Sequence, residues 1–353
     1  KSYFENNKKS PKKFIIFWKV KYNPMTQTIL IISAGKEAIP GILRAKELGL
    51  KVVASDLDPI APGFKYADFS IIASTFDPDM TSKKAISFQE KGNKIQGVLS
   101  VGADVPLTVS KVARELNLKA ISINSAKKCI DKLLMKQVFK SNKVNIPNFY
   151  SIKTVHDIYE VLNSSDKIFV LKPVDSRGSR GVLLIDKESN FKEAFNYSIN
   201  FSGRKSLILE EYIDGPQVST ESIFIEGKLF TPGFADRNYE FLKKYHPNII
   251  ENGGSSPSTL SKKIQLDIHK LVEKGADALG INQGTIKGDI VVKDDIPYII
   301  ELAPRLSGGH FCSKQIPAST GVDFIGLAIK NAMDWPIYSE EVLPTKNKPV
   351  AQR

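Results

Sequence analysis

The sequence predicts two kinds of fold in one chain, a doubly wound α/β domain followed by an α+β domain. Residues 28–33 form a continuous apolar run, as expected of a strand that is buried on both faces. A glycine turn at 34–36, helical spacing at 39–48 and a second apolar run at 51–55 follow, so strand and helix alternate. In the second half of the chain, apolar runs are joined in the manner of antiparallel hairpins, with helices between them.

Turn and cap residues place the remaining elements. Further elements expected in the first domain are strands at 69–73 and 97–101 and helices at 80–90 and 106–116. Ser125 is a suitable N-cap for another helix that runs to about Lys140. Strands of the second domain are expected at 169–174, 181–185, 207–213, 218–225, 228–230, 285–292 and 298–302. Residues 239–258 form a loop of a length that is often functional.

Composition and charge argue against several classes of protein. The net charge is +12, but residues 1–24 hold seven lysines against one glutamate, so half of the excess lies in a basic extension, disordered or not native to the chain. A modest positive balance elsewhere also suits a protein that binds a polyanion, and we expect no nucleic-acid partner. Two cysteines, and no apolar run near the ~20 residues of a membrane span, favour a cytoplasmic protein without membrane contact.

The first stretch with chemical character follows the predicted strand at 169–174. Lys172 lies near the end of this strand. The loop that follows has two arginines and four small residues, Ser176, Gly178, Ser179 and Gly181. Glycines let backbone N–H groups approach phosphate oxygens closely, and small hydroxyl side chains add donors. The loop is either a phosphate-binding lid or a solvated hairpin turn; its residue order differs from a Walker motif.

Asp289 and Glu301 lie on two apolar strands joined by a tight turn around Asp295. If that turn has an odd number of residues centred on Asp295, the two acids face each other with Cβ atoms ~5 Å apart. Like charges so placed are destabilising unless a cation lies between them, and Mg²⁺ favours one or two carboxylates together with phosphate oxygens. A two-residue turn would put the acids on opposite faces as unrelated strand charges.

Two more stretches complete the set. Beyond Glu301 come Arg305, which can stabilise a transferring phosphoryl group, and a Ser-Gly-Gly turn at 307–309, whose backbone can hold a carboxylate or phosphate. Earlier in the chain, three apolar residues at 207–209 run into paired acids. The backbone of such a strand can bind adenine, while an acid takes the ribose hydroxyls. The alternatives are an ordinary strand-to-turn junction and an edge strand with protective charges.

These stretches, in this order and spacing, resemble the ATP-grasp superfamily, in particular its branch with biotin carboxylase, carbamoyl-phosphate synthetase and amino-acid ligases. The resemblance covers residues 25 to about 335. It implies a preceding α/β domain at 25–124 and an α+β ATP-grasp domain at 125–345, in which two subdomains clamp ATP and the lid subdomain spans about 148–212. Residues 346–353 look like the start of a further element that relatives complete.

The resemblance also implies roles for individual residues. Asp289 and Glu301 would hold magnesium, with manganese as a substitute, and Arg305 would steady the transition state of acyl-phosphate formation beside Lys172. The implied ATP contacts are Lys132, Lys172, Ser176, Gly178, Ser179, Gly181, Glu210, Glu211, Tyr212, Ile213 and Gln217. Ala303 stands where the family usually has an asparagine that binds metal, so the number of metal ions in the site, one or two, remains open. Gln217 stands where many members have glutamate.

The implied activity is that of an ADP-forming carboxylate-amine ligase, which phosphorylates a carboxylate with ATP and joins the acyl phosphate to an amine. The expected partners are therefore a small-molecule carboxylate and amine, and a homodimer is the assembly considered. Arg237 is either a clamp for the substrate carboxylate or a surface arginine beside Asp236. The turn residues Ser307, Gly308 and Gly309 are candidates for binding substrate as well.

Two other functions remain open at this point. Asp56 lies about 20 residues beyond Gly35, where an NAD(P)-dependent oxidoreductase has its ribose-binding acid, although residues 33–37 lack the G-x-G-x-x-G spacing. A non-catalytic nucleotide-binding subunit is the second alternative, because Ala303 weakens the metal site. ADP release that requires magnesium, a carboxylate and an amine separates the three functions.

Overall fold

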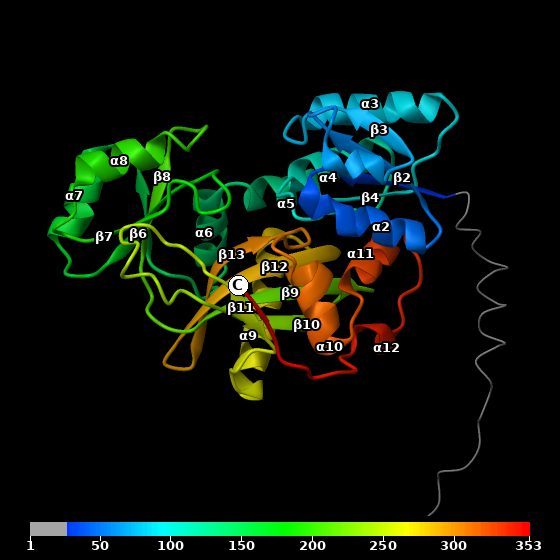
Figure 1. The fold of residues 1–353 in the computed structure, drawn as a ribbon. Helices are drawn as coiled ribbons and strands as arrows, with labels where there is room; N and C mark the ends of the chain where they lie inside the picture. Colours follow the sequence, from blue (N-terminus) through cyan, green and yellow to red (C-terminus); the bar gives the residue numbers. More distant parts are fainter. Residues whose placement is uncertain (1–26) are drawn as a thin grey trace, which may run out of the picture.

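The structure, a computed structural model, describes residues 27–353 and arranges them in three β-sheets with helices around them (Figure 1). The basic extension expected at 1–24 lies outside these residues. Within 27–353, no helix combines the length and apolar character needed to cross a membrane.

The first sheet is parallel and follows the predicted alternation, with strand order β3-β2-β1-β4. Its strands are β1 (Thr28–Ile32), β2 (Lys51–Asp56), β3 (Phe69–Ile72) and β4 (Gly97–Leu99). The helical segments around it are η2 (Lys36–Ala38), α2 (Ile39–Glu47), η3 (Pro62–Lys65), α3 (Pro78–Glu90) and α4 (Pro106–Glu115). The predicted α/β class of this part is confirmed.

Strand β1 is buried on both faces, as its apolar run predicts. Ile29 and Ile31 belong to a core shared with Phe324 of α11 (Phe324–Ala332), whereas Leu30 and Ile32 pack into a separate core beneath α3 and α4. A helix from near the end of the chain therefore covers one face of the first sheet, and Figure 1 shows α11 next to α2. The first sheet and the later part of the chain share a core as a result.

The second sheet is antiparallel, in the order β13-β12-β9-β10-β11-β14. Its strands are β9 (Gln217–Ile225), β10 (Lys228–Arg237), β11 (Gly254–Ser256), β12 (Gly284–Lys293), β13 (Ile296–Ala303) and β14 (Val350–Gln352). Helix α9 (Lys262–Leu279) covers one face with an apolar core and leaves polar residues on the other. Two expectations need correction. The strand expected at 228–230 continues as β10 to Arg237 through a bulge after Phe230, and the loop expected at 239–258 contains the strand β11.

The third sheet is smaller and carries its helices on one face. Its order is β5-β8-β6-β7, with β5 (Phe149–Ile152), β6 (Phe169–Pro173), β7 (Leu183–Ile185) and β8 (Leu207–Glu211). The covering helices are α7 (Val155–Asn163) and α8 (Phe191–Ile199). Figure 1 shows this green layer on one side of the second sheet. Residues of both sheets line one cavity, among them Lys172 of β6 and Asp289 of β12. The strand expected at 207–213 ends two residues early.

The single helix predicted from Ser125 to Lys140 is wrong, because the chain forms α5 (Ile123–Cys129) and α6 (Lys132–Ser141) instead. Asp131 between them has an extended backbone, and its carboxylate accepts a hydrogen bond from the Leu134 N–H at 3.0 Å. An aspartate N-cap therefore restarts the helix. The remaining short helices are η4 (Phe311–Gln315), α10 (Ile316–Thr320) and α12 (Ser339–Val342).

Candidate active site

Two carboxylates face each other on the polar face of the second sheet. Asp289 of β12 pairs with Glu301 of β13, but not through the odd-numbered turn on which the prediction of this pairing depended. The turn has two residues, Asp294 and Asp295, both with positive φ as in a type I′ turn. An extra residue, Ile300, then forms a bulge that shifts the ladder by one position, so that Ile300 and Glu301 both line the cavity. The bulge brings the two acids together.

Asp289 is held by positive side chains of its own sheet. Its Oδ1 lies 2.7 Å from Nη1 of Arg237 and 2.5 Å from Nζ of Lys287, and Ser219 Oγ donates to it at 3.3 Å. Burial alone would raise the pKa of Asp289, but the two cations outweigh burial and hold that pKa well below its usual range. Asp289 is therefore ionised at neutral pH.

Glu301 is ionised for a similar reason, and the pair suits a divalent cation. Its Oε1 lies 3.2 Å from Lys132 Nζ. Burial alone would raise the pKa of Glu301, but nearby lysines, Lys132 foremost, outweigh burial, and the pKa lies below its usual value. The ion pairs of the two acids end on Asp289 Oδ1 and Glu301 Oε1, which leaves the second oxygen of each carboxylate for a metal ion. No group of three or more His, Cys, Asp or Glu residues within 27–353 is arranged to hold a metal ion by itself. Two carboxylates with phosphate oxygens fit Mg²⁺.

A buried charge cluster lies under the cavity on the third sheet. Glu210 of β8 is 2% exposed, and its carboxylate lies 2.8 Å from Lys172 Nζ and 3.3 Å from Lys136 Nζ. Burial lowers the pKa of Lys136 to about 8, despite the opposing effect of Glu210. The Glu210 carboxylate, expected near the ribose, thus holds two lysines in place, one of which lines the cavity.

The residues after Glu210 also line the cavity: Glu211, Tyr212, Ile213 and Gln217. The Glu211 carboxylate forms an ion pair with Lys167 at 2.7 Å and accepts a hydrogen bond from the Asn148 side-chain amide at 2.9 Å. A nucleotide base at this strand would therefore meet backbone groups and the faces of the side chains rather than a free acid.

The loop expected to cover phosphates arches over the cavity with a backbone that small residues favour. Gly178, Ser179 and Gly181 have positive φ values of 62°, 55° and 73°. Ser176, Gly178 and Ser179 line the cavity, whereas Gly181 does not. A Cβ at Gly181 would lie 2.9 Å from Phe201 and Pro173, so this glycine serves close packing. The Lys132 ammonium donates to the Ser176 carbonyl at 2.9 Å and ties the loop to the Glu301 side.

Asp104, in the segment after β4, contributes a carboxylate that the sequence did not single out. Its Oδ2 lies 3.2 Å from Nε of Arg177 in the loop, and its Oδ1 lies 3.6 Å from Nε of Arg305. The Arg177 guanidinium also lies 4.8 Å from the centroid of the Phe76 ring. The first domain therefore contacts both the covering loop and the arginine at the end of β13.

Arg237 belongs to the site rather than to the surface. Its Nη2 contacts Glu251 at 2.5 Å, Nη1 contacts Asp289, and the guanidinium lies 5.4 Å from the centroid of the Tyr239 ring. Asp236 points elsewhere and accepts hydrogen bonds from Ser258 and Thr259. The alternative of a surface arginine beside Asp236 is wrong.

Two backbone N–H groups of the Ser-Gly-Gly turn at 307–309 already donate hydrogen bonds within the protein. The Ser307 N–H donates to Glu221 Oε1 at 2.8 Å, and the Gly309 N–H donates to Glu37 Oε2 at 2.9 Å. Ser307, Gly308 and Gly309 line the neighbouring cavity, but two of these three amides have internal acceptors. Glu221 is fully buried, and burial raises its pKa to about 7.

The site consists of two cavities that meet. One, of about 260 Å³, lies between the second and third sheets and has Lys172, Asp289 and Glu301 in its wall. The other, of about 720 Å³, adjoins the Ser-Gly-Gly turn and Glu251. Four residues line both cavities: Gly178, Arg237, Lys287 and Arg305. Three cations therefore surround the junction, where a phosphoryl group and an acceptor would meet.

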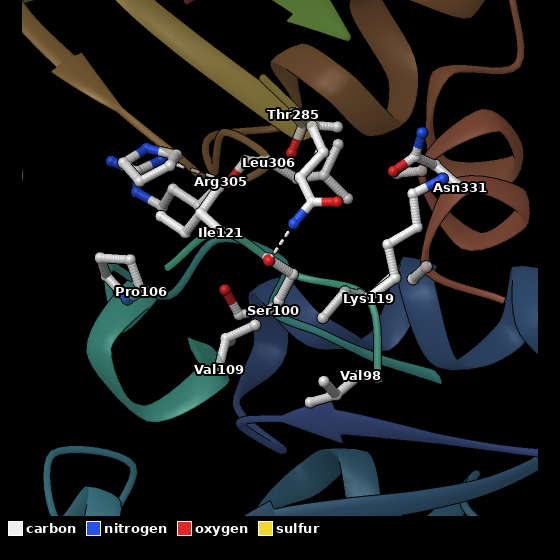
Figure 2. A pocket seen from close by; sticks show the side chains of 17 residues that line it. Val98, Ser100, Pro106, Val109, Lys119, Ile121, Thr285, Arg305, Leu306 and Asn331 are labelled. Carbon is white, nitrogen blue, oxygen red and sulfur yellow. Dashed lines mark hydrogen bonds between the residues drawn. The ribbon is translucent and has the colours of Figure 1, made fainter. Parts of the chain in front are cut away.

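A third cavity, of about 70 Å³, lies behind Arg305 where the first domain meets the second sheet. Figure 2 shows apolar side chains such as Val98, Val109 and Ile121 around it, with Lys119 and Asn331 on one side. These two polar side chains have partners, since Lys119 pairs with Asp334 and Asn331 donates to the Phe224 carbonyl. This cavity is a packing gap next to the active site and not a second site.

Sequence reasoning missed Asp104, Lys136, Lys287 and Glu251. Lys287 had a signal, because it lies two residues before Asp289 and therefore on the same face of β12. Lys136 lies one helical turn after Lys132, which was a weaker signal. Asp104 and Glu251 lie in irregular segments, where no periodicity indicates what a side chain contacts.

Residues 129–309, more than half of the chain, match the model of the ATP-grasp domain. The chain belongs to the ATP-grasp family. This membership confirms the family and the fold class that the sequence predicts, with an antiparallel nucleotide-binding half after the parallel α/β half.

Known members of the ATP-grasp family share the architecture along most of this chain. The chain is 27% identical over 217 residues to D-alanine–D-alanine ligase of Coprothermobacter proteolyticus. This match covers 59% of the chain and 66% of that enzyme, just under two thirds of its length. L-amino acid ligase from Bacillus licheniformis is 25% identical, with a TM-score of 0.73 over 90% of this chain and 77% of that one.

A third similar structure is the biotin carboxylase domain dimer of Hydrogenobacter thermophilus 2-oxoglutarate carboxylase, in complex with MgADP, ADP and bicarbonate. It is 20% identical, with a TM-score of 0.72 over 90% of this chain and 72% of that one. At this identity the likeness concerns the fold alone.

Proposed function

We propose that this ATP-grasp protein is an ADP-forming carbon–nitrogen ligase, which phosphorylates a small-molecule carboxylate with ATP and joins it to an amine. The observation that carries the proposal is the junction of the two cavities. Two ionised acids, Asp289 and Glu301, lie there beside Arg237, Lys287 and Arg305. Such an arrangement suits the transfer of a phosphoryl group from one cavity to an acceptor in the other.

Side chains of both halves would orient the nucleotide. Lys132 and Lys172 lie on the wall of the smaller cavity, where they would donate hydrogen bonds to phosphate oxygens. Each is held by a carboxylate, Lys132 by Glu301 and Lys172 by Glu210, so little reorganisation accompanies binding. The strand end at 210–213 and Gln217 would contact the nucleoside.

Asp289 and Glu301 would hold Mg²⁺, for which Mn²⁺ is the substitute to test. When bound, the ion neutralises charge on the β- and γ-phosphates. That a similar fold binds MgADP supports this assignment.

The reaction would proceed in two steps, formation of an acyl phosphate and its attack by the amine. A carboxylate oxygen of the substrate attacks the γ-phosphorus, the bond from that phosphorus to the β-phosphate oxygen breaks, and ADP leaves. The amine nitrogen then attacks the acyl carbon, the bond to the phosphate oxygen breaks, and one proton leaves the amine. Arg305 would donate to the phosphoryl oxygens, and the loop 175–181 would keep water from the acyl phosphate.

The relatives suggest which substrates to try first. D-alanine–D-alanine ligase and L-amino acid ligase both act on amino acids by name. We therefore infer that an amino acid is the first carboxylate or amine to test, followed by other small carboxylates.

The test is an ADP-release assay with panels of amino acids, other carboxylates and amines, with magnesium present or withheld. The wild-type chain is compared with Glu301→Gln and with Asp295→Asn, which changes an exposed acid in the turn of the same hairpin. We expect ADP release that needs magnesium, an acid and an amine, full activity in Asp295→Asn, and a loss of at least about 100-fold in Glu301→Gln. ADP release by Glu301→Gln at the wild-type rate contradicts the proposed role of that acid.

The NAD(P)-dependent alternative finds no support at its key residue. The Asp56 carboxylate accepts hydrogen bonds from the N–H groups of Ala34 at 2.9 Å and Asp58 at 3.2 Å, so it ties its own loops together. Binding of NAD(P) without binding of ATP would nevertheless overturn the ligase proposal.

A further inference from the structure

Lys287 occupies a position in the sheet that brings its ammonium between the two cavities. Its side chain is 14% exposed, it lines both cavities, and its Nζ lies 2.5 Å from Asp289 Oδ1. Residues 287 and 289 share the cavity-facing side of β12, while the alternate residues Ile286 and Ile290 are buried beneath α9. The ammonium is thus fixed beside the carboxylate by the strand itself.

The residue opposite Lys287 on β13 is Ala303. An alanine side chain has no oxygen with which to bind a metal, and the neighbour on β9, Glu221, is fully buried and bound to the Ser307 N–H. Of the three residues that lie side by side here, only Lys287 reaches the cavity with a polar group. This end of the site has a positive charge of its own and no metal ligand.

A second divalent ion at this end would meet two obstacles. Asp289 Oδ1 already contacts Lys287 and Arg237, so the ion would have to displace one of these cations. It would also lie beside a fixed ammonium, and two like charges at such short range repel each other strongly in a partly buried site. One ion between Asp289 and Glu301 can bind the second oxygen of each carboxylate, and it then displaces neither Lys287 nor Arg237.

We propose that Lys287 takes the place of a second metal ion, so that this site works with one divalent cation and one ammonium on the transferring phosphoryl group. The proposal rests on the proposed ligase function, and it deepens that function by naming a catalytic residue. The Lys287 side chain donates hydrogen bonds to γ-phosphate oxygens while the bond to the β-phosphate oxygen breaks. Its charge offsets the negative charge that moves towards the acceptor cavity.

The first test counts metal ions and needs no substrate. The full chain is mixed with an equal concentration of AMP-PNP, well above its Kd, and titrated with Mn²⁺, whose free concentration is followed by electron paramagnetic resonance. We expect one Mn²⁺ per chain in the wild type and two in the double variant Lys287→Ala/Ala303→Asn, which removes the ammonium and adds an oxygen ligand. Two ions in the wild type, or only one in the double variant, would overturn the proposal.

The second test asks whether the ammonium contacts the γ-phosphate. Lys287→Met should weaken AMP-PNP binding by about tenfold and ADP binding by much less, since ADP has no γ-phosphate. The matched control is Lys228→Met, an exposed lysine on β10 of the same sheet, which should change neither affinity. Equal weakening for both nucleotides, or none, would contradict the contact.

These outcomes separate the proposal from the ligase function. If no acid and amine support ADP release but the metal counts and the nucleotide ratio are as expected, the ligase proposal fails and the role of Lys287 at the γ-phosphate stands. If ADP release requires both substrates but the wild type binds two Mn²⁺ ions, the ligase proposal stands and the single-ion site is wrong.

Discussion

Asp104 and Arg177 form an ion pair between the first domain and the loop over the cavity, with 3.2 Å between Oδ2 and Nε. The same carboxylate lies 3.6 Å from Nε of Arg305, and the Arg177 side chain also stacks on Phe76. Asp104 is only 14% exposed, so this pair is less screened than a surface pair. Closure of the loop and the orientation of Arg305 therefore share one carboxylate.

Asp104→Asn should release the loop. Loss of one or two kcal/mol of closure energy raises the open population by a factor of about 5–30, so trypsin should cleave after Arg177 and Arg180 faster by a similar factor. Cleavage is followed by mass spectrometry. The control is Asp79→Asn, whose carboxylate is 83% exposed and pairs with Lys111. Equal cleavage rates in wild type and Asp104→Asn would show that the ion pair does not hold the loop.

Lys136→Met should be much more destabilising than the loss of an exposed lysine. Lys136 is 1% exposed, donates to the Ile299 carbonyl at 2.9 Å and lies 3.3 Å from Glu210 Oε2. Removing it leaves a buried carboxylate with Lys172 alone, and breaking a buried pair costs about 3–5 kcal/mol. We expect a loss of this size in the free energy of unfolding, measured by urea denaturation.

The matched control for that measurement is Lys187→Met. Lys187 pairs with Asp166, and the two side chains are 57% and 88% exposed, so solvent screens the pair and we expect almost no loss of stability. If both variants lose the same amount, the buried cluster does not hold the third sheet to α6.

The sequence predicted best where one signal dominates. The continuous apolar run of β1 correctly indicated a strand buried on both faces. The pairing of Asp289 with Glu301 was predicted from a turn that the structure does not have, and it holds because Ile300 inserts a bulge. A bulge of this kind leaves no trace in the hydrophobic pattern, since Ile300 directly follows the equally apolar Ile299 and nothing marks one of the two as an insertion.

Charged residues that act over long sequence separations were the hardest to predict. Asp104 meets Arg177 across 73 positions, and Lys136 meets the Ile299 carbonyl across 163. Such contacts depend on how whole sheets are placed, which spacing within one element does not encode. Asp131 is a different kind of miss. Its capping contact with Leu134 is local, so the sequence contains the signal, but one continuous helix was predicted across it.

Glu221 should make the stability of the protein depend on pH in a direction opposite to that of most acids. Burial raises its pKa to about 7, while the unfolded chain has an ordinary value near 4.3. Between these values the folded state holds a proton that the unfolded state has lost, so the contribution of Glu221 is fully present below about pH 4 and is lost as pH rises towards 7. The effect is of the order of 3 kcal/mol.

Glu221→Gln removes this titration and keeps an oxygen for the Ser307 N–H. The free energy of unfolding is measured by urea denaturation at about pH 5 and about pH 7.5, values that bracket most of the transition. We expect the drop between the two conditions to be smaller in Glu221→Gln than in the wild type by about 2–3 kcal/mol. Glu340→Gln, at an exposed position of α12, should leave the wild-type drop unchanged. A drop of the same size in all three proteins would mean that Glu221 is ionised in the folded state throughout this range, with its charge held by the nearby cations Lys287 and Arg305.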